Sequence, residues 1–333
     1  MSTGSVVRQL DVESGELRVL APEEELVGPP AGMRWFDVVR PTPSIIDRLH
    51  TQLGLPVEAT RSACRFDSSA TSPLLPEARR HGDVLLIATC LFTSKEPDGC
   101  GVAAAEVVLI VADHVVVSIH RNSHEAFDSL MEQFPPTAAG ADAASVLFCL
   151  AQAVIAADRR AIADLTARVD RLNHQLFGSS LRPSQLQRDI LGIAHAVATM
   201  RGPLTAGQEI GEVVRDFFGD SHETSAGASE RRWSSTRAAT LRDLDHLQRR
   251  LDFLQQSQLA QLANQAASIS KKIAVLTALT LPQILVSSFF GQNVPAVNGA
   301  SEIVLWSSHG AALLFSVGML WYARRRRWIG LGG

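Results

Sequence analysis

IAVLTALTLPQILVSSFF, from Ile273 to Phe290, is the first of two apolar stretches that decide the fold of this chain. The second is IVLWSSHGAALLFSVGMLWYA, from Ile303 to Ala323. They have about 18 and about 21 residues without Asp, Glu, Lys or Arg, and a hydrocarbon core of about 30 Å needs about 20 helical residues. Little soluble chain remains to cover two such runs, so they predict a hairpin of two membrane-spanning helices.

Basic residues flank this hairpin on one side only. Lys271 and Lys272 precede the first run, the arginines 324–327 follow the second, and the connecting loop has no Lys or Arg. The positive-inside rule then places both termini in the cytoplasm. The N-terminus has no basic segment followed by an apolar one, so we expect no signal peptide. The chain is thus predicted to be a multi-pass protein of the inner (cytoplasmic) membrane.

Composition and cysteine spacing argue against a nucleic-acid binder, a zinc ribbon and a disulfide framework. The chain has 333 residues, a formal net charge of −3 and a mean hydropathy of +0.09, which does not suit a nucleic-acid binder. Its four cysteines, Cys64, Cys90, Cys100 and Cys149, form no CxxC pair. This spacing favours reduced thiols over a zinc ribbon or a disulfide framework.

Residues 1–136 have the pattern of an α/β cytoplasmic domain. The β-branched runs Val84 to Phe92 and Val107 to Ile119 predict buried strands, with a tight hairpin turn at Asp113-His114. Pro43 to Leu53 has helical spacing, with Ser44 as the candidate cap. Pro135-Pro136 marks the predicted boundary of this domain.

The next part of the chain is predicted to be helical. Residues 137–229 read as a helical hairpin with helices at Ala143 to Leu176 and Pro183 to Phe218, and Gly219 to Ser229 as a mobile tip. Residues 230–290 read as one long stalk helix that continues into the first span. Its leucine stripe should pack on the preceding pair of helices or on another subunit; the stripe consists of Leu241, Leu244, Leu247, Leu251 and Leu254. Residues 291–302 form the external loop, 303–323 the second span and 324–333 a basic cytoplasmic tail.

One face of the first span has the pattern of a pore lining. It carries hydroxyl and apolar side chains at three- and four-residue spacing: Ser270, Ile273, Thr277, Leu281, Ile284 and Ser288. Several copies around an axis would stack alternating hydroxyl and apolar rings, as a hydrated pore with a dewetting gate requires. The alternative is that each Ser or Thr hydroxyl bonds back to its own helix. Pro282 also frees a backbone carbonyl one turn earlier and can kink the helix.

The triplet Gly291-Gln292-Asn293 directly follows this span. Gly291 can end a helix in the left-handed conformation, and Asn293 can then turn its amide oxygen toward a cation. A neutral oxygen ligand suits a divalent ion that keeps its water, as Mg²⁺ does. We therefore predict a selectivity motif in which Asn293 contacts the metal through its hydration shell.

These segments resemble those of a known family. Lys271 to Asn293 resembles the first membrane helix of CorA-type divalent-metal transporters, whose Gly-Met-Asn signature is written here as Gly291-Gln292-Asn293. Further resemblance lies in Trp35-Phe36-Asp37, His120-Arg121, Phe127-Asp128, Leu130 and the final basic run. It implies a CorA-like pentameric funnel: a homopentamer with an α/β cytoplasmic domain, a long helical stalk lining the pore, and two C-terminal transmembrane helices, the second on the outside.

The resemblance implies divalent-cation transport, with Mg²⁺ first and Co²⁺ or Ni²⁺ as further candidates. The expected partners are sister chains, membrane lipid and the transported cation, with no cofactor and no nucleic acid. Gln292 replaces the family's usual methionine, and variants at this position also occur in the family's zinc-transporting branch. Ala267 stands where an asparagine is common, and the loop Val294 to Glu302 carries one carboxylate. Zn²⁺ transport of the ZntB type, with or without proton coupling, is therefore an alternative.

Two further alternatives belong to other classes. A membrane-tethered scaffold or signalling protein would use the hairpin only as an anchor and would not require Asn293. An enzyme would need a motif that the chain does not offer, since no phosphate loop or nucleophile motif is present. Four histidines are not in ligand spacing and are expected at the surface or at strand ends: His81, His114, His120 and His124. We predict that the chain is not an enzyme.

Overall fold

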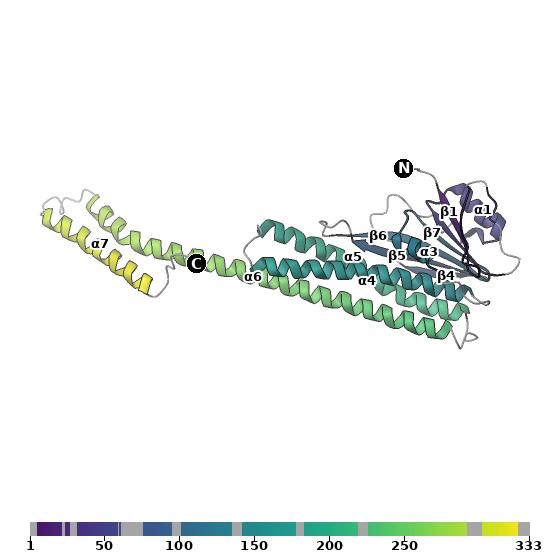
Figure 1. Ribbon diagram of the computed structural model, residues 1–333. Helices are drawn as coiled ribbons and strands as arrows, with labels where there is room; N and C mark the ends of the chain where they lie inside the picture. Colours follow the sequence, from purple (N-terminus) through teal and green to yellow (C-terminus); the bar gives the residue numbers. More distant parts are fainter. Residues whose placement is uncertain are drawn as a thin grey trace. The chain divides into compact units, whose positions relative to one another are not determined.

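The structure is a computed structural model that describes residues 5–21, 24–26, 32–58, 60, 76–94, 101–134, 142–177, 183–218, 226–291 and 302–325. Its contacts divide the chain into two compact units, Met1–Leu254 and Gln255–Gly333. Figure 1 draws the ribbon in sequence colours, from the purple strands of the first unit to the yellow last helix of the second.

A seven-stranded sheet is the base of the first unit, with strand order β2-β1-β3-β7-β6-β5-β4. Neighbouring strands pair antiparallel except β3 and β7, which are parallel. The strands are β1 (Val6–Asp11), β2 (Leu17–Leu20), β3 (Arg34–Val39), β4 (Glu77–His81), β5 (Val84–Ser94), β6 (Val102–Ala112) and β7 (Val115–His120). The sheet and its covering helices confirm the predicted α/β class.

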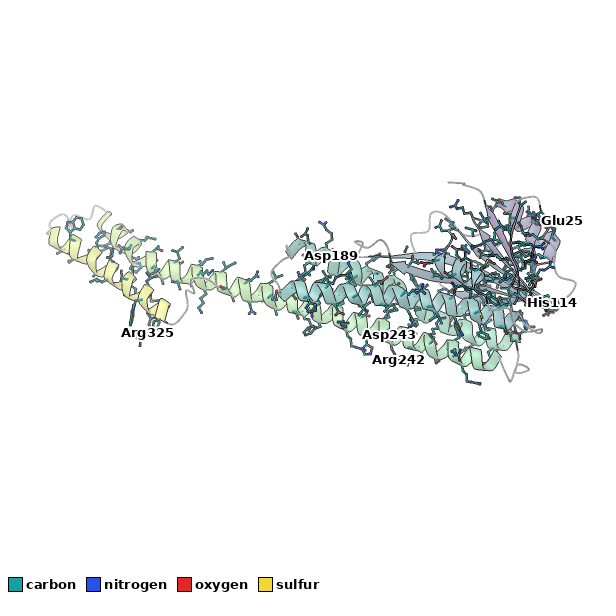
Figure 2. All side chains as sticks on the ribbon, viewed as in Figure 1. Glu25, His114, Asp189, Arg242, Asp243 and Arg325 are labelled. Atoms are coloured by element: carbon teal, nitrogen blue, oxygen red, sulfur yellow. The ribbon has the colours of Figure 1, made fainter. Side chains whose placement is uncertain are left out.

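The hairpin between β6 and β7 forms where the sequence predicts it. Asp113 and His114 make the turn, and Ala112 pairs with Val115 across it. His114 is labelled at the end of the sheet in Figure 2. Most of the β-branched residues on both sides are buried, because both faces of these central strands are covered.

Each face of the sheet has its own hydrophobic core. On β3, Phe36 and Val38 join the core beneath helix α1 (Pro43–Leu53), while Trp35 joins the opposite core. That second core is completed by α3 (Glu125–Glu132) and by the beginning of α4 (Ala143–Phe177). Alternate residues of one strand therefore serve different layers, as the two-residue period of a strand requires.

Helix α1 has the predicted bounds but not the predicted cap. Thr42 is the N-cap residue and makes no side-chain capping bond, whereas Ser44 lies inside the first turn. The two hydroxyl oxygens are 3.0 Å apart. Pro43 at the first helical position sets the helix start, because its fixed φ suits that position and its missing N–H is not needed there. Gly54, with φ +67°, ends the helix in the left-handed conformation.

Three long helices follow. After α4 come α5 (Pro183–Phe218) and α6 (Ala226–Gly291), a helix of 66 residues. Helix α6 begins four residues before the predicted start at Glu230, because Ala226 to Ser229 extend the helix instead of joining a loop. Residues 219–225 of the predicted mobile tip and the predicted boundary at Pro135-Pro136 lie outside the described residues.

The leucine stripe of α6 packs within the chain. Leu244, Leu247, Leu251 and Leu254 are buried in one core with side chains of α4 and α5, and Leu241 packs against that core. Of the two partners that the sequence allowed, the preceding helix pair is the one observed. Figure 1 shows α4 and α5 running beside this first part of α6.

The second unit contains the rest of α6, from Gln255 to Gly291, and α7 (Glu302–Arg325). Pro282 lies inside α6, and the helix continues for nine residues beyond it, to Gly291. Helix α7 covers the second predicted span, Ile303 to Ala323, with one further residue before it and two after it.

Candidate functional site

The candidate site lies on the apolar part of α6. Among the described residues, one helix is long and apolar enough to cross a membrane, over Arg231–Phe289. Only 6% of its most apolar window is buried by the chain itself. The core helix of a soluble protein would be covered by its own chain, so this stretch needs lipid or other chains to cover it.

One face of this part of α6 packs on α7. Val275 is 5% exposed, Leu279 and Pro282 on the same face are half-buried, and Ala312 of α7 is 7% exposed. The Ser316 hydroxyl of α7 donates a hydrogen bond of 2.9 Å to the Leu279 carbonyl. This bond joins the two helices one turn before Pro282.

The predicted pore lining lies on the other side of α6. Ile273, Leu281 and Ile284 are 58%, 50% and 59% exposed, and Ser270, Thr277 and Ser288 are exposed as well. At about 100° per residue, the centre of this face lies roughly 170° from the face that packs on α7. The six residues therefore lie on one side of the helix that their own chain leaves uncovered.

The uncovered arc is wider than the predicted face. Leu276, Leu285 and Phe289 flank it and are also exposed. The Thr277 hydroxyl donates to the Ile273 carbonyl at 3.0 Å, so for this residue the structure shows the bond back to its own helix. Its oxygen can still accept a hydrogen bond from water. The assignment of the pore lining remains a prediction.

The selectivity motif begins at the last residue of α6, which is Gly291. Gln292 and Asn293 lie outside the described residues, so the metal contact of Asn293 remains a prediction. At the other end of the hairpin, the Arg325 guanidinium lies 5.2 Å from the centre of the Trp321 ring. Arg325 is labelled in Figure 2. A cation stacked on an aromatic ring suits a membrane–water interface, where such rings collect.

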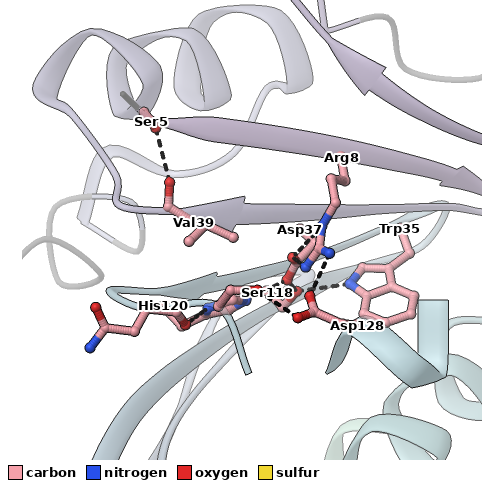
Figure 3. Close-up of polar contacts among 10 residues, drawn as sticks. Ser5, Arg8, Trp35, Asp37, Val39, Ser118, His120 and Asp128 are labelled. Carbon is pink, nitrogen blue, oxygen red and sulfur yellow. Dashed lines mark hydrogen bonds and ion pairs between the residues drawn. The ribbon is translucent and has the colours of Figure 1, made fainter. Parts of the chain in front are cut away.

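A buried polar cluster organises the first unit (Figure 3). Asp37 Oδ1 accepts hydrogen bonds from Ser118 Oγ at 2.5 Å and contacts His120 Nε2 at 2.8 Å. Asp37 Oδ2 accepts from Arg8 Nε at 3.1 Å, and Arg8 also pairs with Asp128 at 2.5 Å. Trp35 completes the cluster by donating from Nε1 to Ser118 Oγ at 2.9 Å.

Charge and hydrogen bonding keep Asp37 ionised in this cluster. Burial pushes the pKa of Asp37 upward, but the hydrogen bonds and charges of His120, Ser118 and Arg8 outweigh burial and leave the pKa below its usual value. The cluster joins β1, β3, β7 and α3, and we interpret it as structural. The segments that carried the family resemblance, Trp35 to Asp37, His120 and Asp128, thus meet at one place.

Three of the four histidines lie where the sequence predicts them, since His81 and His120 end strands and His114 is exposed in a turn. His124 departs from the prediction, because it is the half-buried N-cap residue of α3. His120 ends a strand as expected, but its side chain is fully buried because it pairs with Asp37. Across the described part of the chain, no three or more His, Cys, Asp or Glu side chains are placed to hold a metal ion.

Comparison with known proteins places the chain. The model of the family described as "CorA-like Mg2+ transporter protein" matches residues 30–325. The chain belongs to this family. No curated protein matches the chain closely enough to count as a relative.

Solved structures share the fold at low sequence identity. The complete structure of the CorA magnesium transporter from Methanocaldococcus jannaschii is 14% identical, with a TM-score of 0.73, over 99% of this chain and 100% of that one. The full-length CmaX protein is 18% identical, with a TM-score of 0.66, over 98% and 100%. The ZntB cytoplasmic domain from Vibrio parahaemolyticus is 10% identical, with a TM-score of 0.54, over 79% and 100%.

Proposed function

We propose that this CorA-family chain transports divalent cations across the cytoplasmic membrane, with Mg²⁺ as the first candidate. The observation that carries the proposal is the uncovered face of α6, which lies opposite α7 and ends at Gly291 of the Gly-Gln-Asn motif. Family membership supports transport as the class of function.

A path for ions along this face needs more than one copy of the chain. A single pair of helices cannot enclose water, whereas five copies of α6 around an axis can place Ile273, Thr277, Leu281 and their neighbours on the inside. Closely spaced apolar rings exclude water and raise the barrier for an ion, and hydroxyl rings replace part of its hydration. A homopentamer is therefore part of the proposal.

Asn293 is the proposed selectivity residue. Its amide oxygen can accept hydrogen bonds from the water that a divalent ion retains, so a ring of five amides would hold a hydrated ion without removing its shell. The loop Val294 to Glu302 carries a single carboxylate, so attraction of cations to the mouth should be weak.

Uptake into liposomes tests the choice of ion. Purified chain is reconstituted, and entry of Mg²⁺, Co²⁺, Ni²⁺ and Zn²⁺ is measured with and without a pH gradient. We expect Mg²⁺ entry that needs no pH gradient. Zn²⁺ entry that requires the gradient would favour the ZntB-type alternative, to which Gln292 in place of methionine points. No uptake of any of the four ions would favour the membrane-tethered scaffold.

Native mass spectrometry in mild detergent tests the assembly. We expect a dominant species of five chains. A dominant monomer or dimer would contradict the proposed pore, because neither can enclose a water-filled path with this face of α6.

A further inference from the structure

A cavity lies between the sheet and the helices in the first unit. Its volume is about 50 Å³, and apolar side chains of β5, β6, α4, α5 and α6 form most of its lining. The charged exceptions are Asp158 of α4 and Arg237 of α6, and Thr89 adds a hydroxyl group. A water needs roughly 10–15 Å³ of such space and two or more polar partners, so the cavity can hold a few waters near these groups.

Asp158 is buried with little compensation. It is 2% exposed, and the one hydrogen bond that the described residues give it comes from the Phe92 N–H to Oδ1, at 2.9 Å. This N–H belongs to the part of β5 that β4 is too short to pair, since β4 pairs only with residues 84–88. Burial raises the pKa of Asp158 to about 7, although the Phe92 N–H and the charge of Arg237 act in the opposite direction.

Arg237 faces the same cavity but is bonded to α5. Its Nε and Nη2 donate to the Leu204 carbonyl at 3.2 and 3.0 Å, and Nη2 also reaches the Pro203 carbonyl at 3.3 Å. The guanidinium lies 5.4 Å from the centre of the Trp233 ring. It passes so close to Gly207 that a Cβ there would lie 1.3 Å from Nη2. Any side chain at position 207 would therefore have to displace the guanidinium from its place against α5.

The carboxyl and the guanidinium share the cavity without forming an ion pair. Within the described residues, no Asp158 oxygen lies within 4.0 Å of an Arg237 nitrogen. A neutral Asp158 does not attract Arg237, which keeps its hydrogen bonds to the α5 carbonyls. An ionised Asp158 attracts the guanidinium strongly, because the surroundings are apolar and screen little.

We propose that Asp158 and Arg237 form a pH-responsive link that changes how α6 packs against α4 and thereby regulates transport. The inference rests on the proposed function, because α6 is the helix that also carries the predicted pore lining. At acid pH, Asp158 is neutral and Arg237 stays hydrogen-bonded to the carbonyls of α5. Neutral to alkaline pH ionises Asp158 and draws Arg237 across the cavity.

Among the described residues that line the cavity, the Cys90 thiol is the one titratable group besides Asp158 and Arg237. Burial raises the pKa of the Cys90 thiol on β5 to about 12, with added effects of the charges of Glu106 and Asp158, so the thiol stays protonated. Glu106 of β6 is half-buried opposite Cys90 in the strand register. Helix α5 lines the cavity with apolar side chains. Arg237 is the charged group that faces Asp158 from α6.

Difference infrared spectroscopy of the full-length chain tests the ionisation directly. The protonated carboxyl C=O band of the wild type should disappear with a midpoint near pH 7, and Asp158→Asn should lack that transition. Arg237→Gln should move the midpoint to higher pH, since the positive charge that favours the carboxylate is gone. The matched control is Asp164→Asn, which removes an exposed carboxylate from the same helix and should leave the transition intact.

Uptake measured against the pH on the cytoplasmic side tests the regulation. The wild type and Asp164→Asn should show a change in rate centred on the infrared midpoint, and Asp158→Asn should hold the acid-side rate at all pH values. Two results would overturn the link. One is a carboxyl transition that persists in Asp158→Asn, and the other is a wild-type uptake rate that does not change around the pH of the infrared midpoint. A wild type without uptake at any pH would overturn the proposed function, while its infrared transition would still support ionisation of Asp158.

Discussion

The two units of the chain handle their apolar surface in opposite ways. In the first unit, the leucine stripe of α6 and both faces of the sheet are covered by the chain itself. In the second, the same helix leaves Ile273, Leu281 and Ile284 at least half exposed. The difference shows that residues up to Leu254 form a core within one chain, whereas from Gln255 on one face of α6 is left uncovered by its own chain.

The largest effect is expected at the end of the uncovered face. Asn293→Ala should reduce divalent-cation uptake by more than about tenfold, because the proposed ring of amides around the hydrated ion would be lost. Folding and assembly should not change. Asn298→Ala, in the same loop, is the matched control and should retain uptake. Equal uptake by both variants in correctly assembled protein would contradict the proposed role of Asn293 in selectivity.

A large effect on stability is expected in the first unit, where burial is complete. Asp37→Ala should lower the free energy of unfolding by about 3–5 kcal/mol, because His120 and Arg8 would lose the carboxylate that compensates their burial. Asp47→Ala, which removes an exposed carboxylate of α1, should change it by less than about 0.5 kcal/mol. Thermal unfolding followed by near-UV circular dichroism measures both. Similar values for the two variants would show that the cluster does not stabilise the unit.

The same cluster predicts a dependence on pH. The native pKa of Asp37 lies below its ordinary value of 3.8, so ionised Asp37 contributes stability above pH 3.8. That contribution is lost as the pH falls through the native pKa. Acid unfolding of the wild type should therefore include a component that Asp37→Ala lacks. Parallel acid-unfolding curves for the two proteins would contradict this assignment.

A smaller effect is expected where α7 meets α6. Ser316→Ala removes the bond to the Leu279 carbonyl and should cost about 0.6 kcal/mol, the usual value for a hydrogen bond between membrane helices. Ser307→Ala is the control, because that hydroxyl bonds to Val304 of its own helix. Thermal stability in detergent should fall more for Ser316→Ala. The reverse order would show that α7 does not pack on α6 through this face.

The parts of the fold that could be predicted from the sequence are those with a local sequence signal. Helices α4 and α5 and the β6–β7 hairpin were predictable because apolar periodicity and turn residues are local signals. Strand β4, with the sequence EARRH, was missed, because a charged edge strand has no apolar alternation. The cap at Ser44 was wrong, because Pro43 fixes the helix start ahead of it.

Only part of the candidate site could be predicted from the sequence. The uncovered face of α6 follows from its helical spacing, and Trp35 to Asp37 could be singled out by resemblance. The partner of Asp37, Arg8, could not be found, because the contact depends on the register between β1 and β3. The cavity with Asp158 and Arg237 was also missed, since neighbours 79 residues apart in sequence leave no local signal.

The most direct test of the pore face compares two leucines of α6 that lie two positions apart. Leu281 belongs to the uncovered face, and Leu279 lies on the face that packs on α7, roughly 160° away at 100° per residue. Divalent-cation leak into liposomes is measured for Leu281→Ser and Leu279→Ser at equal protein content. A leakier closed state is expected for Leu281→Ser only, because a wetted ring lowers the barrier to ions. A leak in Leu279→Ser without one in Leu281→Ser would contradict the pore face and all six residues assigned to it.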